Sequence, residues 1–402
     1  SGKVPFYEPG LDEALLEVIA SGNLRFKPEH DEESREALIH LLCVGTPQSK
    51  TGLGADTTYL FNALDALAPF LNEDALVAGK STVPVGTAAE LAAHLSTKVD
   101  FEPHLAWNPE FLREGTALQD SLLPDRVVIG VKEAWSEKLL RLLYEPITNQ
   151  GVPLLSVDIP TAELVKVAAN SFLATKISFI NAMAEIAEVA GADAVKLAEA
   201  IGMDERIGNK FLKSGIGFGG GCLPKDIRGF VARAEELGVG QAVGFLKEVE
   251  AINLRRRSRV IELAQEELGD LTGRRVTILG AAFKPETDDI RDSPAMAVAE
   301  QFWMAGAKVV IHDPKALDNV RRVYPQLETE DNLHASVRGS ELVVLTTEWK
   351  QYRTVDPLLL GQHVTNRLII DGRNALHVPT WQEANWQVIA LGRNLDRIPA
   401  LV

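Results

Sequence analysis

ALIHLLCVGTP, residues 37–47, is a short apolar run that ends in glycine, threonine and proline. The pattern returns in DALVAGKSTVPVG, residues 74–86, which lies between two segments with helical spacing of apolar residues, 59–71 and 87–95. RVVIGV, residues 126–131, predicts another strand. Short apolar runs that alternate with helical patterns are typical of βαβ units in a parallel sheet. Because such sheets bind ligands at the carboxyl ends of their strands, the residues that end these runs are expected at a ligand-binding edge.

The same alternation returns in the last third of the chain. RRVTILGAAF (274–283) and KVVIHDP (308–314) flank the helical pattern AMAVAEQFWMAGA (295–307). ELVVLTTEW (341–349) and RLIIDGRNAL (367–376) supply two further strand patterns. We therefore expect a second doubly wound α/β domain.

Between these two regions the apolar residues recur at three- and four-residue spacing, in segments 161–202, 230–238 and 245–268. This spacing predicts helices, and no strand pattern interrupts them. The fold class expected is therefore α/β, with two Rossmann-like domains joined by a helical connector of the kind that often supplies a dimer interface. The predicted boundaries are a first Rossmann-like domain at residues 1–155, a helical connector and dimerisation domain at 156–268, and a second Rossmann-like domain at 269–402.

Length and composition narrow the possible functions. A chain of 402 residues has room for two or three domains of about 100–200 residues each. Hydrophobic residues at 46% and charged residues at 24% are the balance of a globular protein, which excludes disordered, collagen-like and coiled-coil classes. The 41 Lys and Arg against 56 Asp and Glu give a net charge of −15. That charge argues against nucleic acid or an anionic membrane as the main partner.

The two cysteines, Cys43 and Cys222, exclude a disulfide framework and a zinc site of three or four thiolates, so no metal site is expected. The sequence has few cysteines, no uncharged apolar run of about 18 residues and no signal-peptide core at its start. These features predict a protein of the reducing cytoplasm. Cys43 lies inside an apolar run and is expected in the core.

GIGFGG, residues 215–220, matches the pattern G-x-G-x-x-G, but that pattern binds dinucleotides only where it follows a strand and opens a helix. One interpretation is a flexible surface loop, and the other is a loop whose backbone approaches a ligand closely. The three glycines before Cys222, with Lys225 and Asp226 after it, favour a site. Cations and backbone N–H groups near a cysteine stabilise the nucleophilic thiolate.

Three other groups of polar residues have ordinary structural interpretations, which stand beside any functional one. Lys166 and Asn170 share a helix face and could present donors to an oxyanion, or could be a snorkelling lysine and a locally bonded amide. Glu110 and Glu114 follow a proline and could be acid–base groups or partners of a helix dipole. Thr82 could be a turn hydroxyl and nothing more.

Eight motifs taken together resemble the nucleotide-sugar 6-dehydrogenase family, in its UDP-glucose branch. In chain order they are YEPGL (7–11), VGTP (44–47), KSTVPVGT (80–87), NPEFLREGTA (108–117), the helix with Lys166 and Asn170, FLKSGIGFGGGCLPKD (211–226), AFKPETDDIRDS (282–293) and DGR (371–373). The match spans nearly the whole chain. The resemblance implies a four-electron oxidation of UDP-glucose to UDP-glucuronate, with NAD as cofactor and a thiohemiacetal and thioester on a cysteine. It also implies that the domain at residues 1–155 is NAD-binding and that the domain at 269–402 is UDP-binding.

The resemblance also assigns roles to individual residues. It implies that Cys222 is the nucleophile, that Lys166 compensates oxyanion charge and that Asp226 tunes an ordered water. The other catalytic residues implied are Asn170, Thr82 and, for thioester hydrolysis, Glu110. Those implied to bind the cofactor are Thr46, Pro47, Thr82, Glu114, Lys225 and Arg291. Those implied to bind the UDP-sugar are Phe111, Leu112, Lys166, Asn170, Phe211, Lys213, Gly219, Phe283, Lys284, Arg373 and, reaching the partner's substrate in a homodimer, Arg206.

One departure concerns the cofactor. In the family a βαβ unit with the dinucleotide fingerprint precedes YEPGL, and this sequence starts after that unit, so it is expected to bind UDP-sugar but to bind NAD poorly. GDP-mannose 6-dehydrogenase or another nucleotide-sugar dehydrogenase is an alternative, since it shares the cysteine loop. A cofactor-free nucleotide-sugar binding or dimerisation module is another. GTA at 115–117 and TEWKQYR at 347–353 resemble the UDP-glucose branch more closely.

Overall fold

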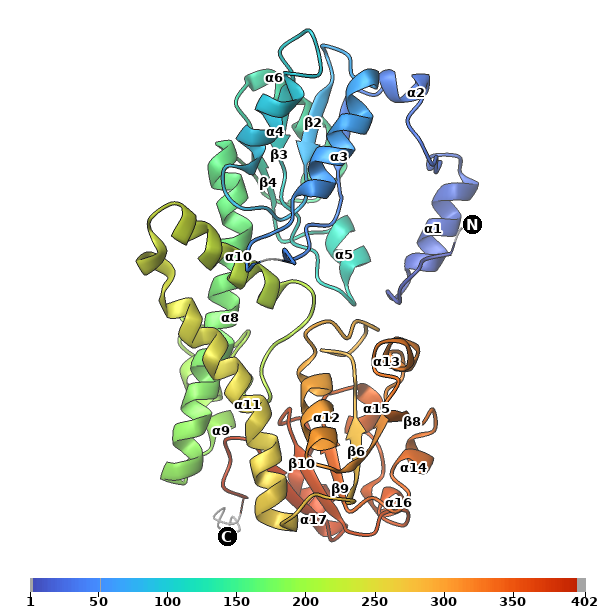
Figure 1. The fold of residues 1–402 in the computed structure, drawn as a ribbon, viewed down its shortest axis with the longest axis vertical. Coiled ribbons are helices and arrows are strands. Elements are labelled where there is room, and N and C mark those ends of the chain that lie inside the picture. Colours follow the sequence, from blue (N-terminus) through green and yellow to red (C-terminus); the bar gives the residue numbers. More distant parts are fainter. Residues whose placement is uncertain (1–2, 51, 396–402) are drawn as a thin grey trace. The chain divides into compact units, whose positions relative to one another are not determined.

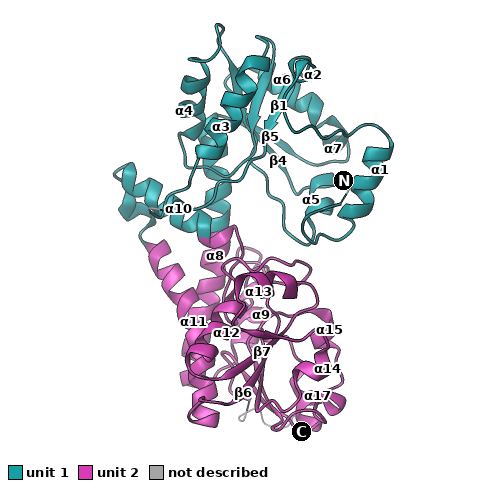
Figure 2. Cartoon of the chain, turned by 45° about the vertical axis from the view of Figure 1, so that its right-hand side comes forward, with its two compact units in different colours: residues 1–171, 225–244 teal, residues 172–224, 245–402 magenta. Residues whose placement is uncertain are grey.

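The structure, a computed structural model, describes residues 3–50 and 52–395. The chain forms two compact units (Figures 1 and 2). Unit 1 comprises Ser1–Ser171 and Lys225–Gly244, and unit 2 comprises Phe172–Pro224 and Phe245–Val402. This division shares the helical middle region between the units, so the three predicted domain boundaries remain a prediction.

Within the part of the chain that the structure describes, unit 1 has a five-stranded sheet in the order β1-β2-β3-β4-β5. The strands are β1 (Ile39–Leu42), β2 (Leu76–Gly79), β3 (His104–Trp107), β4 (Val127–Gly130) and β5 (Leu154–Val157). β1, β2 and β3 are parallel, as are β4 and β5. β3 and β4 pair antiparallel, through Trp107 and Gly130. The α/β class is confirmed, but the expectation of a wholly parallel sheet is wrong at this step.

The connection between β3 and β4 explains the change of direction. Parallel neighbours need a crossover, usually a helix that packs an apolar face on the sheet. The connection holds α5 (Ala117–Leu122), which buries Asp120 and no apolar side chain. Because α5 offers no apolar face to the sheet, the chain does not cross over it and returns as an antiparallel strand.

Helices pack on both faces of this sheet. α3 (Thr58–Leu67), the 3₁₀ turn η1 (Ala68–Phe70) and α4 (Thr87–Leu95) share one core with it, and α6 (Ala134–Leu143) and α7 (Glu145–Thr148) share the other. α1 (Leu11–Ala20) and α2 (Glu32–Arg35) bury no side chain. Val77 of β2 belongs to the core that α3 and α4 share with the sheet, whereas its neighbours Leu76 and Ala78 belong to the core beneath α6. A Cβ atom on Gly79 would lie 2.1 Å from the Trp107 ring, so this position requires glycine.

β1 is the edge strand of the sheet, and its surroundings are open. Leu38 and Leu41 are 59% and 41% exposed, and Cys43, which follows the strand, is exposed as well. The expectation that Cys43 lies in the core is wrong, because an apolar run is fully buried only when other elements cover its edge and both its faces.

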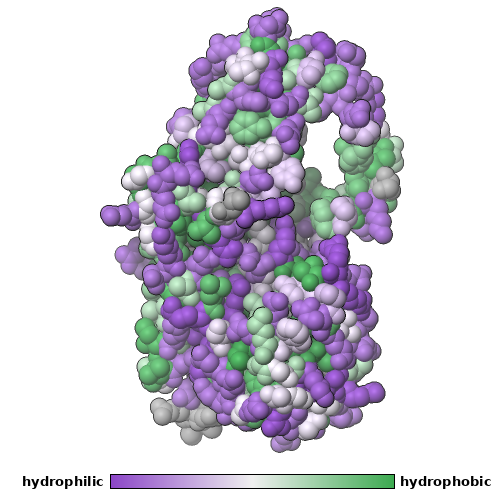
Figure 3. Space-filling view, in the orientation of Figure 1, coloured by the Kyte–Doolittle hydropathy of each residue, from purple (hydrophilic) through white to green (hydrophobic). Residues whose placement is uncertain are grey.

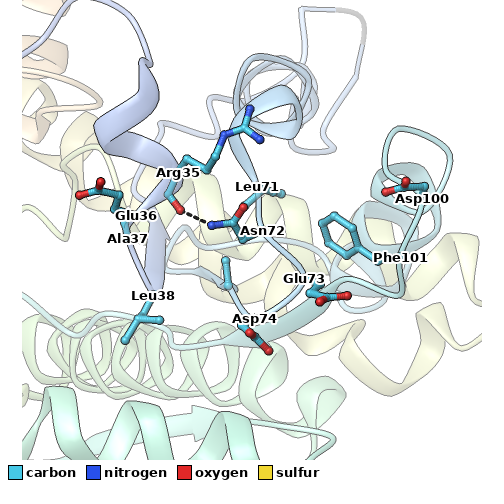
Figure 4. A pocket seen from close by; sticks show the side chains of 11 residues that line it. Arg35, Glu36, Ala37, Leu38, Leu71, Asn72, Glu73, Asp74, Asp100 and Phe101 are labelled. Atoms are coloured by element: carbon cyan, nitrogen blue, oxygen red, sulfur yellow. Dashed lines mark hydrogen bonds between the residues drawn. The ribbon is translucent and has the colours of Figure 1, made fainter.

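Figure 4 shows a cavity of about 470 Å³ at the amino ends of β1, β2 and β3. Its lining includes the exposed Leu38 and the partly buried Phe101 among five charged residues. Asn72 crosses it and donates from Nδ2 to the Arg35 carbonyl at 2.6 Å. The cavity lies at the strand ends opposite those expected to bind ligands.

The helices of the middle region confirm the predicted connector. They are α8 (Ile159–Ala190), α9 (Ala194–Gly202), α10 (Leu223–Glu236), the 3₁₀ turn η2 (Gly240–Val243) and α11 (Phe245–Leu268). In unit 2, α8 and α11 lie side by side, and the Ser178 hydroxyl donates to the Val249 carbonyl at 2.6 Å.

Unit 2 has, among the described residues, a six-stranded sheet in the order β11-β10-β9-β6-β7-β8, with every neighbouring pair parallel. The strands are β6 (Arg275–Leu279), β7 (Lys308–His312), β8 (Glu328–Thr329), β9 (Leu342–Leu345), β10 (Leu368–Asp371) and β11 (Gln387–Ala390). The helices are α12 (Pro294–Met304), α13 (Leu317–Val323), α14 (Leu333–Ser336), α15 (Lys350–Arg353), α16 (Pro357–Leu360) and α17 (Val378–Glu383). This is the doubly wound order, whose switch point between β6 and β9 is where such sheets bind ligands. The second predicted α/β domain is confirmed.

One carboxylate joins the helices of unit 2 to the end of its sheet. Glu188 of α8 accepts hydrogen bonds from Arg256 at 2.8 Å and from Arg259 at 3.0 Å, both on α11. It also accepts one from the backbone N–H of Gly392, just past β11, at 2.9 Å. Although burial opposes ionisation, the two arginines hold the pKa of Glu188 below its usual value. The network fixes α8 and α11 against the sheet.

Candidate active site

The carboxyl ends of β1 and β2 in unit 1 are joined through side-chain hydroxyls. Thr46 donates to the Thr82 carbonyl at 2.7 Å, and Ser81 donates to the Val44 carbonyl at 2.6 Å. Thr82, Lys225 and Asp226 line one small hollow, whose other lining residues are Ala55, Val83, Pro84, Val85, Val167, Gly229, Phe230 and Arg233. Two of the residues implied to bind the cofactor, Thr46 and Thr82, therefore lie together at the edge where ligands were expected.

A buried polar cluster in unit 1 contains three of the predicted residues. Asn170 on α8 donates from Nδ2 to Oδ2 of Asp226 on α10 at 2.7 Å. Nζ of Lys225 lies 2.8 Å from the other carboxylate oxygen, Oδ1, as an ion pair without hydrogen-bond geometry. Asn170 is 8% exposed and Asp226 is 4% exposed. The carboxylate is thus removed from water and is neutralised by an adjacent cation.

Lys166, one helical turn before Asn170, belongs to a second cluster. Its ammonium lies 3.4 Å from Oε1 of Glu110 and 5.5 Å from the centre of the Phe111 ring. The guanidinium of Arg126 covers the same ring at 3.9 Å. Oε2 of Glu110 accepts a hydrogen bond from the Leu112 N–H at 2.6 Å. The resemblance assigned Phe111 to the substrate, and in the structure its ring has two cations nearby, Lys166 and Arg126.

The loop that carries Glu110 and Phe111 is held by residues that the sequence analysis did not single out. Asn108 accepts hydrogen bonds from Lys80, at 2.9 Å, and from Tyr144. Asp120 accepts bonds from the Arg113 backbone N–H and from its Nε, both at 2.9 Å. The guanidinium of Arg113 lowers the pKa of Asp120, and Asp120 raises the pKa of Arg113. In the sequence, one feature could have indicated such a role: Lys80 lies directly after a predicted strand.

Glu163 on α8 is another residue that the sequence analysis missed. Its two carboxylate oxygens accept hydrogen bonds from the Gly86 and Ala88 N–H groups, both at 2.7 Å, at the start of α4. Burial raises its pKa. A carboxylate at a helix N-terminus pairs with unsatisfied N–H groups, so Glu163 fixes the loop that follows Thr82.

In unit 2, the glycine-rich segment before Cys222 is packed against the loop of residues 282–293. The Gly220 N–H donates to the Arg291 carbonyl at 3.0 Å. A Cβ on Gly219 would lie 2.2 Å from the Asp292 carbonyl oxygen, and one on Gly220 would lie 2.8 Å from the Phe283 ring. Because side chains larger than hydrogen would clash, glycine is required here. Residues 214–220 are buried, so the interpretation as a flexible surface loop is wrong.

Distant side chains of unit 2 brace this segment. Asn253 on α11 accepts from the Phe218 N–H at 2.7 Å and donates to the Phe218 carbonyl at 3.0 Å. Arg257 donates to the same carbonyl at 3.0 Å, and Asn181 on α8 accepts from the Gly215 N–H at 2.9 Å. The braced segment ends at Cys222, whose side chain is exposed and stands directly before α10. The positive end of a helix dipole favours a thiolate there.

Arg373 connects the glycine segment to the switch point of the second sheet. Its guanidinium donates to the carbonyls of Gly217 at 2.8 Å, Phe283 at 3.1 Å and Thr346 at 2.7 Å. Glu348 lies 3.6 Å from its Nε, and burial lowers the pKa of Arg373. Lys284 lies over the Phe283 ring at 5.4 Å. Four residues implied to bind substrate therefore lie around one edge of this sheet: Gly219, Phe283, Lys284 and Arg373.

The structure does not bring every predicted residue into these clusters. The Arg206 side chain is 88% exposed and pairs with Asp204 at 2.6 Å. Phe211, Lys213 and Leu112 are also exposed. Phe211 has a φ of 62°, in the left-handed region that non-glycine residues seldom adopt.

Two further searches cover the described residues, 3–50 and 52–395. They contain no group of three or more His, Cys, Asp or Glu side chains that could hold a metal ion. None of their helices has both the length and the apolarity needed to span a bilayer.

Models of one protein family match most of the chain. Residues 1–148 match the NAD binding domain of the UDP-glucose/GDP-mannose dehydrogenase family. Residues 160–255 match the central domain of that family, and residues 277–378 match its UDP binding domain.

Individual relatives extend the match. UDP-glucose 6-dehydrogenase of Rickettsia felis is 36% identical over 400 residues, which cover 99% of this chain and 88% of the relative. The Pseudomonas aeruginosa enzyme of the same name is 38% identical over 394 residues, with 94% and 85% covered. Among solved structures, a UDP-glucose dehydrogenase from Pyrobaculum islandicum superposes with a TM-score of 0.89 at 35% identity, with 98% of this chain and 88% of the other covered.

Proposed function

Because the chain belongs to the UDP-glucose/GDP-mannose dehydrogenase family, we propose that it catalyses the NAD-dependent oxidation of UDP-glucose to UDP-glucuronate. The observation that carries the proposal is the start of α10. There Cys222 precedes Lys225 and Asp226, and Asp226 is hydrogen-bonded to Asn170. A thiol, a cation, a carboxylate and an amide in that arrangement suit nucleophilic catalysis at a carbonyl carbon.

The residues of unit 1 fit the nicotinamide end of NAD. The hollow beside the carboxyl end of β2 has apolar walls that include Val83, Pro84 and Phe230, and its polar lining residues are Thr82, Lys225, Asp226 and Arg233. Apolar walls with a few polar groups are typical of cofactor sites. The residues proposed to hold the cofactor are Thr46, Pro47, Thr82, Glu114, Lys225 and Arg291. When bound, NAD accepts a hydride from the substrate carbon.

The proposed chemistry converts the C6 alcohol of the sugar to a carboxylate in two oxidations. The alcohol loses a proton and a hydride and becomes an aldehyde. The Cys222 thiolate then adds to the aldehyde carbon, and the thiohemiacetal that forms loses a proton and a second hydride to become a thioester. Water adds to the thioester carbon and the C–S bond breaks, which releases the carboxylate and the thiol. Two hydrides leave, so two NAD are reduced per sugar.

Polar groups of unit 1 are proposed to manage charge during these steps. The Lys166 ammonium stabilises the oxygen anion that develops at C6. The Asn170–Asp226 pair holds a water and moves its proton, with Thr82 as a further partner of that water. Glu110 has one carboxylate oxygen near Lys166 and is proposed as the base that activates water for thioester hydrolysis.

The second sheet is proposed to bind the UDP part of the substrate. Arg373, Lys284, Phe283 and Gly219 lie at its switch point or on the segment packed there. Phe111, Leu112, Phe211 and Lys213 are proposed as further substrate contacts. The match of residues 277–378 to a UDP binding domain supports this assignment.

A homodimer is proposed, with α8 at its centre. Phe172, Phe179 and Ile186 recur at seven-residue spacing along α8 and are 67%, 50% and 59% exposed. Figure 3 shows apolar side chains along the edge where α8 and α9 lie. A heptad-spaced apolar stripe suits a second helix. Arg206, fully exposed near the end of α9, is proposed to reach the substrate of the partner subunit. The thiol chemistry needs a reducing compartment, so the cytoplasm is the proposed location.

An assay of the protein joined to the N-terminal βαβ unit of its family tests the function. UDP-glucose should yield UDP-glucuronate with two NADH formed per sugar, and GDP-mannose should yield no acid at the same concentration. Preference for GDP-mannose would move the protein to the other branch of the family. Binding of UDP-glucose with no NADH formed would indicate the cofactor-free module instead.

A further inference from the structure

The N-terminal segment of unit 1 has a single buried residue, and that residue is a carboxylate. Among described residues 3–41, Glu8 is the one buried side chain, at 7% exposure. α1 and α2 in the same segment bury none. A carboxylate withdrawn from water needs hydrogen-bond partners that compensate its desolvation.

The partners of Glu8 lie in the loop that carries Glu110. Oε2 of Glu8 accepts a hydrogen bond from the Gly115 N–H and Oε1 accepts one from the Ala117 N–H, both at 2.7 Å. Gly115 has a φ of 80°, a turn conformation suited to glycine, and Ala117 begins α5. The carboxylate therefore fixes two backbone N–H groups on either side of Thr116.

The same loop is fixed at two other points. Asp120 accepts hydrogen bonds from the backbone and side chain of Arg113, and the Asn108 N–H donates to the Gly79 carbonyl at 2.8 Å. Between these points, Oε1 of Glu110 lies 3.4 Å from Nζ of Lys166. Of these fixing groups, Glu8 is the most distant in the chain, 107 residues away from Gly115.

We propose that Glu8 is a positioning residue for Glu110: its carboxylate holds the loop of residues 108–120 so that Glu110 stays placed to activate water. The inference rests on the proposed function, because it names the hydrolysis of the thioester as the step that depends on Glu8. Charge-assisted hydrogen bonds from two N–H groups are strong and directional. Their loss leaves donors without partners and frees the loop.

The test compares Glu8→Gln with Glu13→Gln, which makes the same chemical change on the exposed face of α1. Glutamine keeps one oxygen acceptor but turns an amide NH₂ toward the second N–H. We expect Glu8→Gln to keep the rate of the first hydride loss, measured in a single turnover, within about twofold, and to slow acid release by about tenfold or more. Intact-protein mass spectrometry should then show a sugar adduct on Cys222 that is absent from Glu13→Gln.

Other outcomes would overturn the inference. If Glu8→Gln and Glu13→Gln behave alike while Glu110→Gln accumulates the adduct, hydrolysis does not depend on Glu8. Equal slowing of both stages in Glu8→Gln would show a structural role only. If Glu8→Gln does not fold, Glu8→Asp, which keeps the charge, replaces it under the same criteria. Absence of an adduct in Glu110→Gln would overturn the proposed hydrolysis itself, an outcome separate from the others.

Discussion

Cys222 follows a segment, residues 214–220, whose backbone is buried and tightly packed. Gly219 and Gly220 leave no room for side chains, and Asn253 hydrogen-bonds both backbone groups of Phe218. The thiol is exposed while the backbone before it is buried. A nucleophile on a rigid support loses little entropy when it forms a bond to its substrate.

At this scale the first prediction is that Cys222→Ser stops carboxylate formation. A hydroxyl is a weaker nucleophile than a thiolate and would form an ester in place of a thioester. UDP-glucuronate formation, measured by chromatography, should fall far more than about tenfold, or about 1.4 kcal/mol of barrier. Cys43→Ser is the matched control and should keep its activity. Turnover within about tenfold of the unmodified protein would contradict the covalent role.

Glu110→Gln is predicted to separate the two stages of the reaction. An amide cannot accept a proton from water, so thioester hydrolysis should slow by about 10²–10⁴-fold while the first hydride loss continues. Rapid quenching followed by mass spectrometry should find an adduct on Cys222. If steady turnover collapses and no adduct appears, Glu110 acts in an earlier step.

The structure of the loop between β3 and β4 was predicted least well from the sequence. The motif NPEFLREGTA, residues 108–117, predicted the polar residues, but not that Asp120 would bind Arg113 or that β4 would run antiparallel to β3. Strand positions follow from local apolar runs, which a sequence displays directly. Strand direction depends on whether α5 can pack on the sheet, and that depends on residues far apart in the chain.

The glycine-rich segment before Cys222 was also predicted only in part, and for the same physical reason. Its chemistry could be predicted from the adjacent Cys222, Lys225 and Asp226, because these lie within five residues of one another. Its burial could not, since the bracing groups Asn253 and Arg373 lie on α11 and after β10. Contacts of long sequence separation have no local signal.

The pair of Asp120 and Arg113 gives a prediction for pH dependence. Because Arg113 lowers the pKa of Asp120, the ionised carboxylate stabilises the folded protein above the ordinary pKa of an aspartate. That stabilisation is lost as the pH falls through the lowered value. Asp120→Asn should therefore reduce the free energy of unfolding by about 1–2 kcal/mol at pH 7, and the difference should shrink in strongly acidic solution.

Urea unfolding of both proteins at pH 7, 5 and 3 measures this difference. Asp125→Asn, which alters a neighbouring carboxylate, is the control. A loss of stability in Asp120→Asn that stays constant over this pH range would show that charge plays no part.

At the scale of the molecule, the apolar stripe of α8 predicts assembly. Phe179→Glu places a charge in the middle of the stripe and should convert the proposed dimer to monomer, because a buried unpaired charge is costly at an interface. Sedimentation equilibrium measures the mass. Phe26→Glu is the control, since Phe26 is 68% exposed and lies outside the stripe. A monomeric parent protein, or a Phe179→Glu variant with unchanged mass, would remove α8 from the interface.

One hydrogen bond of Glu188 can form only late in the synthesis of the chain. Its partner Gly392 follows 204 residues later. At about 5–20 residues per second, a ribosome needs roughly 10–40 s to reach Gly392 after it has made Glu188. Arg256 and Arg259 are made 68 and 71 residues after Glu188, so in the later part of that interval the carboxylate has its two arginines but lacks the backbone donor that closes the network. The network that joins the helices of unit 2 to the second sheet can therefore be completed only after β11 has been made.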